Sequence, residues 1–310
     1  MQAVSAVIPS RNGAHLLSLS LPPLLAQLGD ASEVIVVDHE STDGTADLLR
    51  ANFPRVKRLA VRSARSFSDL CNAGFAACSN RLVLLLNNDM VVTPGFLGPL
   101  AEQMSRTSVF AAGPEYHMRR GFEDAYVCGS CGDLHRESEN VSHAPSTRLD
   151  APAAGGLFDA EKFRELGGFD PMFRPFYWED MDLGWRAWRR GWRIVQEPRS
   201  VMYHEQGATI RRTYARTQAE VVFAKNRFLF IWKNIREPDL LAGHFARLPW
   251  RLAQDVAARG GLVMLRGLLA ALRQFGEAAA RRGTEAAALP DRRVICRALE
   301  HPRAFLSQVA

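Results

Sequence analysis

The sequence has few cysteines, and this scarcity excludes a disulfide-stapled protein. Five cysteines in 310 residues are too few, and odd in number, for a disulfide framework, so a reducing cytosol is favoured. Cys128 and Cys131 have the spacing of half a zinc site. Structural zinc needs four ligands and no second pair follows, so a metal or redox role for this pair is only an alternative.

The chain also lacks a long uninterrupted apolar run. Residues 1–10 show no basic region followed by an apolar stretch, which predicts that no secretory signal is present. The longest apolar run near the C-terminus, residues 260–276, contains Arg266 and Arg273. It falls short of the roughly 20 residues that cross a bilayer. We therefore expect a cytoplasmic protein without a transmembrane helix.

Positive charge is scarce in the first two thirds and concentrated at the end. Residues 1–205 carry 21 Lys and Arg against 25 Asp and Glu, whereas residues 206–310 carry 18 against 8. A basic segment suits nucleic acid, an anionic membrane surface or a solvated helical face. Because its basic residues are nearly all arginines on leucine-rich helices without a nucleic-acid module, we expect a membrane rather than nucleic acid.

What is present is the pattern of an α/β protein. Hydrophobic residues make up 47% of the chain and charged residues 23%, which is typical of a globular enzyme with a large core. Short apolar runs predict buried parallel strands, and the segments between them have helical spacing. The predicted strands are residues 4–8, 34–37, 56–61 and 82–86, and the predicted helices are residues 15–28, 46–51 and 68–78, with a capping cluster at 41–45. Strand and helix in alternation indicate a doubly wound unit.

The second half divides into a less regular part and a helical part. We expect loops with one or two short strands over residues 113–153, and helices over 158–166 and 180–190. Beyond Thr213 the predicted helices are residues 214–234, 240–259 and 262–282. The predicted organisation is therefore an α/β domain over residues 1–212 and a basic helical extension over residues 213–310.

The last of these helices has an amphipathic pattern. Its leucines form one face, and Arg259, Arg266 and Arg273 recur every seven residues along the edge of that face. This is the arrangement of a helix that lies in a membrane interface. A helix packed on its own protein, with exposed arginines, is the equal alternative.

Polar residues follow three of the predicted strands. Ligands of open parallel sheets bind beyond the carboxyl ends of the strands, so residues 10–13, Asp38 and residues 87–89 should face one crevice. Asp89 offers hard oxygens to a divalent cation. In isolation, an Asn-Asp turn after a buried strand explains the same residues.

A second acidic cluster lies at a predicted helix start. Glu179, Asp180 and Asp182 follow several aromatic residues, and an apolar surrounding keeps a carboxylate near the pKa of a general base. Part of the cluster could serve as helix caps. Asp182 should point elsewhere and pair with Arg186 at i+4. His204 follows a strand-like segment, where it is either a further metal ligand or a histidine with ordinary partners.

In this order, six segments resemble family 2 glycosyltransferases of the GT-A fold, a Rossmann-like, mostly parallel sheet flanked by helices. The matching segments are residues 7–13, 36–45, 72–74, 84–89, 155–158 and 178–183. They span about residues 4–212. The segments at 84–89 and 178–183 most resemble bacterial rhamnosyltransferases and related transferases of cell-envelope glycans.

The resemblance implies an inverting, metal-dependent transfer from a UDP- or dTDP-sugar to a hydroxyl of a glycan or lipid-linked acceptor in envelope polysaccharide synthesis. Asp38 would accept the imide N–H of the base, Asp89 and His204 would hold Mg²⁺ or Mn²⁺, and Asp180 would be the base, with Glu179 as the fallback. The nucleotide site would be lined by Pro9, Ser10, Arg11, Asn72 and Asn88. The place of action would be the cytoplasmic face of the inner membrane, and the C-terminal helices could instead form a homodimer.

Departures from the family pattern leave alternatives open. Asn87 stands where the family usually has Asp, and Glu40 fills a turn that often uses glycine, so the conformation of that turn is open. An idle GT-A scaffold is disfavoured because the acids at 38, 89 and 180 are present. A sugar-1-phosphate nucleotidylyltransferase is disfavoured because no glycine-rich, lysine-containing loop follows the first strand.

Overall fold

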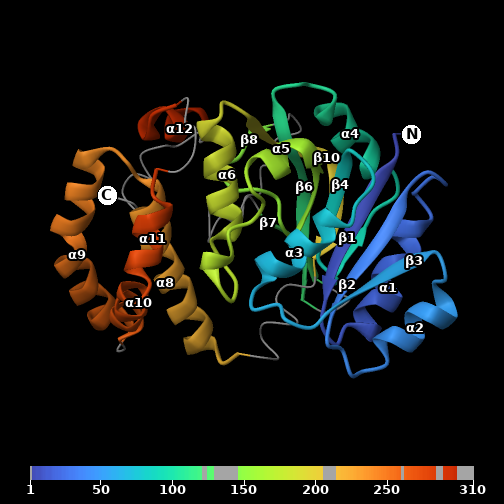
Figure 1. Ribbon diagram of the computed structural model, residues 1–310, viewed down its shortest axis with the longest axis horizontal. Coiled ribbons are helices and arrows are strands. Elements are labelled where there is room, and N and C mark those ends of the chain that lie inside the picture. Colours follow the sequence, from blue (N-terminus) through green and yellow to red (C-terminus); the bar gives the residue numbers. More distant parts are fainter. Residues whose placement is uncertain are drawn as a thin grey trace.

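A computed structural model describes residues 2–120, 124–128, 146–204, 214–259, 262–283 and 289–298. Its centre is one ten-stranded sheet with the order β3-β2-β1-β4-β9-β6-β10-β5, in which β7 pairs with β6 and β8 pairs with β10. Helices cover both faces of the sheet, and a group of C-terminal helices lies at one end of the molecule (Figure 1). The predicted α/β architecture, a sheet flanked by helices, is confirmed (Figure 1).

The N-terminal half is the parallel unit that the sequence predicts. Neighbouring strands run parallel in the order β3-β2-β1-β4. Their side chains alternate between two buried clusters: Val7 and Leu85 lie in one, and Ile8 and Leu84 in the other. Burial on both faces is why β1, β2 and β4 are continuously apolar in sequence, whereas the edge strand β3 exposes Lys57 and Arg58. The elements are β1 (Val4–Ser10), α1 (Ala14–Leu25), β2 (Glu33–His39), α2 (Thr45–Asn52), β3 (Val56–Val61), α3 (Phe67–Ala76) and β4 (Leu82–Leu86).

Beyond β4 the sheet is mixed. Its elements are β5 (Met90–Val92), α4 (Leu97–Met104), β6 (Val109–Arg120), β7 (Asp124–Cys128), β8 (Ser146–Thr147), β9 (Gly155–Asp159), α5 (Ala160–Glu165), the 3₁₀ turn η1 (Pro171–Phe173), α6 (Glu179–Arg189) and β10 (Arg193–His204). Strand β9 runs antiparallel between β4 and β6. Strand β10 runs parallel to β6 and antiparallel to β5.

Two predictions for this region are wrong in part. The helix predicted over 158–166 begins only at Ala160, because the preceding residues pair with β4 and the Asp159 carboxylate caps the helix by accepting the Glu161 and Lys162 N–H groups. The loop predicted from residue 113 is instead the second part of β6. The register with β10 shifts just after Pro114, so its missing N–H falls at an irregularity where proline is tolerated.

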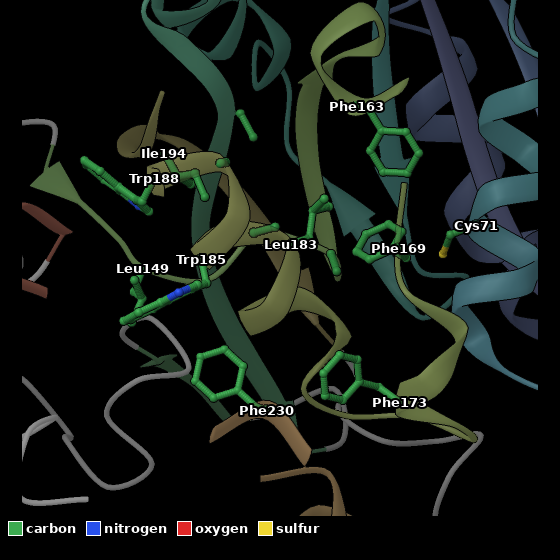
Figure 2. Packing of buried hydrophobic residues seen from close by; sticks show 14 of the residues in the cluster. Cys71, Leu149, Phe163, Phe169, Phe173, Leu183, Trp185, Trp188, Ile194 and Phe230 are labelled. Atoms are coloured by element: carbon green, nitrogen blue, oxygen red, sulfur yellow. The ribbon is translucent and has the colours of Figure 1, made fainter. Parts of the chain in front are cut away.

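The C-terminal helices are α8 (Arg216–Asn234), α9 (Pro238–Arg259), α10 (Val263–Leu272), α11 (Phe275–Arg281) and α12 (Asp291–Ala298). Helix α8 lies between α6 and the outer helices (Figure 1). The rings of Trp185 on α6 and Phe230 on α8 meet edge to face, with their centroids 5.7 Å apart (Figure 2). The aromatic core around α6 therefore continues into α8.

The helix predicted over 262–282 is wrong as a single element. It breaks at Arg273 and Gln274 into α10 and α11. Ala271 before the break and Ala278 after it are both fully buried in the same core cluster, so the turn directs two successive helices onto one surface. Among the helices that the structure describes, none has the length and apolar character needed to cross a membrane.

Candidate active site

The carboxyl ends of β1, β2 and β4 meet, as the sequence predicts. Ser10 at the end of β1 lies in register beside Asp38 at the end of β2. Asn88, just after β4, donates a hydrogen bond from Nδ2 to Ser10 Oγ at 3.0 Å. All three side chains are buried. Gly13 packs so closely on Ser10 and Asn88 that no Cβ would fit there.

Asp38 already has a cationic partner. Arg58 Nε donates to Asp38 Oδ2 at 2.7 Å, and Asp38 Oδ1 accepts a long bond of 3.3 Å from Ser41 N. The Asp38 side chain is fully buried, whereas that of Arg58 is 38% exposed. Arg58 was not predicted, because the register between parallel strands joined by a helix cannot be read from sequence.

The loops after β1 and β2 are joined through left-handed residues. Asn12 and Glu40 have φ values of 49° and 50°. Asn12 N donates to Ser41 Oγ and Asn12 Oδ1 accepts from Thr42 N, both at 2.8 Å. The turn left open by the sequence thus keeps a glycine-like conformation although Glu40 occupies it. Beside it, Pro9 is buried and Arg11 is exposed.

Asp89 and His204 come together from distant parts of the chain. Strand β10 runs antiparallel to β5 and places His204 opposite Met90, the neighbour of Asp89. His204 Nε2 lies 3.3 Å from Asp89 Oδ1. Apart from this contact with His204, Asp89 Oδ1 accepts no hydrogen bond from the described residues, and neither does the buried Asn87 Oδ1. Such oxygens are expected to have a further partner that is an ion or water.

This arrangement fits a divalent cation with few protein ligands. Mg²⁺ commonly takes one or two protein carboxylates, and substrate phosphates and waters fill its other positions. Within the described ranges no set of three His, Cys, Asp or Glu side chains could hold a metal. Asp89 and His204 are therefore the candidate protein ligands, and a diphosphate would have to contribute the remaining oxygens.

The acidic cluster begins α6 after a sharp turn. Tyr177 and Trp178 are both left-handed, with φ values of 72° and 74°. Asp180 is partly exposed, and its Oδ1 accepts from Met181 N at 2.7 Å. Burial, and after it the carboxylate of Asp150, raise the pKa of Asp180 to about 6. Such a carboxylate is largely ionised at neutral pH and can still accept a proton.

Glu179 is less suited to be the base. Its side chain is buried, and its Oε2 has no hydrogen-bond partner among the described residues. Burial, and then the charge of Asp180, raise the pKa of Glu179 well above its ordinary value. Both effects disfavour the charged form that a base needs, which leaves Asp180 as the accessible carboxylate.

A short segment joins the two groups of acidic residues. Asn87 N donates to Ala154 O at 2.8 Å, and Ala151 N donates to Asp180 O at 3.0 Å. Residues 151–154 span at most about 11 Å. The backbone before Asp89 and the first turn of α6 are therefore held at opposite ends of one short stretch.

Comparison with known proteins identifies the family. The family model described as "Glycosyltransferase like family 2" matches residues 2–224. The chain belongs to this family. The match covers all six segments of the resemblance and extends into α8 of this transferase.

Relatives of this chain include an O-antigen biosynthesis protein and two named glycosyltransferases. The O-antigen biosynthesis protein RfbC of Myxococcus xanthus is 29% identical over 225 residues, which are 67% of this chain and 18% of that protein. The pre-mycofactocin glycosyltransferase of Mycobacterium tuberculosis is 26% identical, over 69% of this chain and 45% of that protein. The chain thus spans less than half of both. An N-acetylglucosaminyl-diphospho-decaprenol L-rhamnosyltransferase of M. tuberculosis is 22% identical, over 79% of this chain and 88% of that protein.

Solved structures show the same fold. Residues 1–349 of Staphylococcus aureus TarS superpose with a TM-score of 0.61 at 15% identity, covering 99% of this chain and 87% of that one. The mannosyltransferase PcManGT of Pyrobaculum calidifontis, in complex with GDP-Man and Mn²⁺, superposes with a TM-score of 0.54 at 16% identity, covering 99% and 83%. Both comparisons include the C-terminal helices of the transferase.

Asp182 of the transferase is structural, as predicted. Its Oδ2 accepts from Arg186 Nε at 2.8 Å. Its Oδ1 accepts from Lys233 Nζ at 2.6 Å and from Asn234 Nδ2 at 2.8 Å. Burial alone would raise its pKa, but Lys233 and Arg186 hold the pKa of Asp182 below its ordinary value. The first turn of α6 is thereby tied to α8.

Helix α8 also holds the turn in front of α6. Asn226 Nδ2 lies 2.9 Å from the carbonyl oxygens of Phe173, Phe176 and Tyr177. Lys225 Nζ donates to the Arg174 carbonyl at 2.6 Å. No local pattern in the sequence points to these residues, because nothing in it shows which face of α8 meets the acidic motif.

Asn72 has contacts other than those its predicted role requires. Its Nδ2 donates to Phe169 O at 2.8 Å and its Oδ1 accepts from Phe169 N at 2.9 Å. These bonds hold the turn that leads into η1, so a contact with nucleotide stays a prediction. Cys131 lies outside the described residues, so the metal or redox alternative for Cys128 and Cys131 stays open.

Proposed function

We propose that this transferase moves a sugar, with inversion, from a UDP- or dTDP-sugar to a hydroxyl of a glycan or lipid-linked glycan in cell-envelope polysaccharide synthesis. The observation that carries the proposal is that Asp89 pairs with His204 at one edge of the sheet. Asp180 is connected to the same edge through the hydrogen bonds of residues 151–154. The names of two relatives, an O-antigen biosynthesis protein and a decaprenol-linked rhamnosyltransferase, support the class of acceptor.

The donor would bind at the ends of β1, β2 and β4. Asp38 Oδ1, to which the described residues donate only the long bond from Ser41, is the oxygen best placed to accept the imide N–H of uracil or thymine. Because Asp38 is fully buried, a base that contacts it must displace Arg58 or the Ser41 turn. Pro9, Ser10, Arg11 and Asn88 would line the rest of this site.

Asp89 and His204 would hold Mg²⁺ or Mn²⁺ together with the diphosphate. When bound, the ion neutralises negative charge on the leaving diphosphate. The pairing of β5 with β10 fixes the Asp89 and His204 side chains against each other, so both are positioned before the ion binds. TarS has been crystallised with UDP-GlcNAc, and PcManGT with GDP-Man and Mn²⁺. A nucleotide sugar and a divalent ion are the ligand classes that we propose for this site too.

Asp180 would act as the general base. The acceptor oxygen attacks the anomeric carbon from the side opposite the diphosphate, and Asp180 removes the hydroxyl proton as the new bond forms. Attack from the opposite side produces inversion. We place the reaction at the cytoplasmic face of the inner membrane, where a lipid-linked acceptor would be available.

A calorimetric titration tests the donor site. UDP, dTDP and GDP are titrated with and without Mn²⁺ into the wild type, Asp89→Ala and the control Asp47→Ala, which removes an exposed acid on α2. We expect UDP or dTDP to bind, and this binding to require both Mn²⁺ and Asp89 but not Asp47. Failure of all three nucleotides to bind would favour the idle scaffold.

The products of turnover separate the two enzymatic alternatives. A sugar transferase releases a nucleoside diphosphate, whereas a nucleotidylyltransferase releases pyrophosphate. We expect only the nucleoside diphosphate from a nucleotide-sugar donor and an envelope-lipid extract. Release of pyrophosphate in a sugar-1-phosphate reaction would contradict the proposal.

A further inference from the structure

Exposed large apolar side chains are concentrated on three C-terminal helices. The described residues include eight such side chains, and seven of them lie between residues 245 and 275. These seven are Phe245, Trp250, Val256, Leu262, Leu269, Leu272 and Phe275. The eighth, Leu19, lies on α1. Single exposed hydrophobic residues are normal, but a concentration of them marks an interaction surface.

The solvent-facing side of α9 is apolar along most of the helix. Its exposed apolar residues are Ala242, Phe245, Ala246, Pro249, Trp250, Ala253, Val256 and Ala257. At 3.6 residues per turn they occupy an arc of about 140°. Arg251 and Asp255 fall on the opposite side, where they are half-buried. A helix on the surface of a globular protein normally shows the reverse pattern.

Helix α10 continues this surface and adds positive charge. One side of α10 is fixed to the protein, since a Cβ at Gly267 would lie 2.6 Å from Ala224 Cβ on α8. The other side exposes leucines with Arg266 and Arg273 among them. Among the described residues of α9, α10 and α11, the exposed charged residues are Asp239, Arg247, Arg266 and Arg273, and Asp239 is already paired with Arg292.

We propose that this face of α9, α10 and α11, here called the C-terminal apolar face, binds the surface of an anionic phospholipid bilayer. It comprises the seven large apolar side chains and the three exposed arginines. The apolar side chains would enter the boundary between headgroups and acyl chains, and the guanidinium groups would bond lipid phosphates. Under this proposal one side of α10 packs on the protein and the other side meets the membrane, so the two alternatives for the last predicted helix would apply to opposite sides of α10.

Charge complementarity favours a bilayer over a second copy of the chain. In a symmetric dimer the same patch meets itself, so two sets of arginines would face each other. The exposed carboxylate among the described residues of these helices, Asp239, already pairs with Arg292. Anionic headgroups supply the missing negative charge. The amino end of α6 and helix α10 both lie toward the lower edge of the view in Figure 1. With α10 on the membrane, Asp180 would be brought toward a lipid-linked acceptor. This benefit of the orientation rests on the proposed function.

Vesicle co-sedimentation of the full chain tests the proposal. Vesicles of phosphatidylglycerol and phosphatidylcholine are compared with phosphatidylcholine alone. The triple variant F245S/W250S/L269S should lose at least about tenfold in apparent affinity for the anionic vesicles, because burial of each side chain is lost. R266Q/R273Q should lose about fivefold per arginine, and the wild type should bind less as salt rises.

The matched controls make the same kinds of substitution at exposed residues outside the C-terminal apolar face. Leu19→Ser removes the exposed leucine on α1, and Arg50→Gln removes an exposed arginine on α2. Neither should change vesicle binding, and all variants should keep the circular dichroism spectrum and unfolding temperature of the wild type. Wild-type protein that does not bind anionic vesicles, or a triple variant that binds them equally well, overturns the proposal.

A second pair of measurements separates the other outcomes. Sedimentation velocity that shows a wild-type dimer, and a monomer for the triple variant, overturns the proposal in favour of a second copy. UDP titration of the same variants reports on the donor site, which we expect to be unchanged. A failed membrane proposal with intact UDP binding is therefore distinguishable from a failed donor site.

Discussion

Asp180 differs from its neighbour Glu179 in accessibility, and this difference predicts the effect of substituting each. Asp180→Asn should lower kcat by about 10²- to 10⁴-fold, the usual contribution of a general base, with little change in KM for the donor. Glu179→Gln should have a much smaller effect, since Glu179 is buried and its raised pKa disfavours the charged form that a base needs. Steady-state kinetics of both variants measures this, and equal losses in kcat would contradict the assignment.

The raised pKa of Asp180 also predicts a pH dependence. A base acts only when it is unprotonated, so kcat should be low below the folded pKa, rise through about pH 6 and level off above it. The measurement is a pH profile of kcat at saturating donor and metal. A profile that is flat from about pH 5 to 7 would show that another group accepts the proton.

Glu40 occupies a conformation that suits glycine. A residue with a side chain costs roughly 1–2 kcal/mol in the left-handed conformation, and glycine does not carry this cost. Glycine loses more backbone entropy on folding, which cancels part of the gain. With φ at 50°, Glu40→Gly should raise the free energy of unfolding by about 0.5–1 kcal/mol. Urea denaturation measures this change. Glu40→Ala is the matched control, and a gain of the same size in that variant would attribute the effect to charge rather than to φ.

At the scale of elements, α8 acts as a support for the loop that carries the base. Asn226→Ala removes the donor to three carbonyl oxygens around the left-handed pair Tyr177 and Trp178. The turn should relax and displace Asp180, which lowers kcat by about 10- to 100-fold. The proposed donor site lies at the ends of β1, β2 and β4, away from this turn, so the affinity for UDP should not change.

Kinetics and calorimetry together test this role of α8. Arg216→Ala is the control, because Arg216 lies on the same helix and its side chain is 93% exposed. A loss of UDP affinity that matches the loss of kcat would indicate general unfolding instead of a displaced base.

The elements also show where sequence reasoning succeeds and where it stops. Strands β1, β2 and β4 were predictable because they are apolar on both faces. The more exposed edge strand β3 was predictable because it continues the alternation of strands with helical segments. Strand β9 was not, because residues 155–159 also continue into a helical pattern and their partners β4 and β6 are distant in sequence. The course of β6 through Pro114 was hidden for the same reason, since only the irregular pairing with β10 explains it.

The residues of the candidate site likewise divide into those that the sequence pattern locates and those that it does not. Asp38, Asp89 and Asp180 lie at ends of elements that the pattern locates, so the sequence singles them out. Arg58 and Asn226 depend on strand register and on which face of a helix meets which loop. Such partners are set by packing between segments and leave no local pattern.

At the scale of the whole molecule, donor binding should stabilise the fold. A ligand that binds only the native state adds about 2.7 kcal/mol at one hundred times its Kd. Mn²⁺ and UDP together should therefore raise Tm by several degrees, because Asp89 gains the ion as a partner in addition to His204. Differential scanning fluorimetry measures the shift, with EDTA as the control. An equal shift in Asp89→Ala would place the metal elsewhere.

The insertion of β9 beside β4 has a consequence for synthesis on the ribosome. Leu82–Leu86 pairs along one edge with β1, and along the other with Gly155–Asp159. At translation rates of about 5–20 residues per second, the nascent chain carries β4 for about 4–15 s before β9 has been made. During that interval a strand that is apolar on both faces has an open edge, which is a template for pairing with other chains. Holdase chaperones that bind nascent chains should therefore protect this one at the stage when residues 2–86 have emerged and residues 155–159 have not.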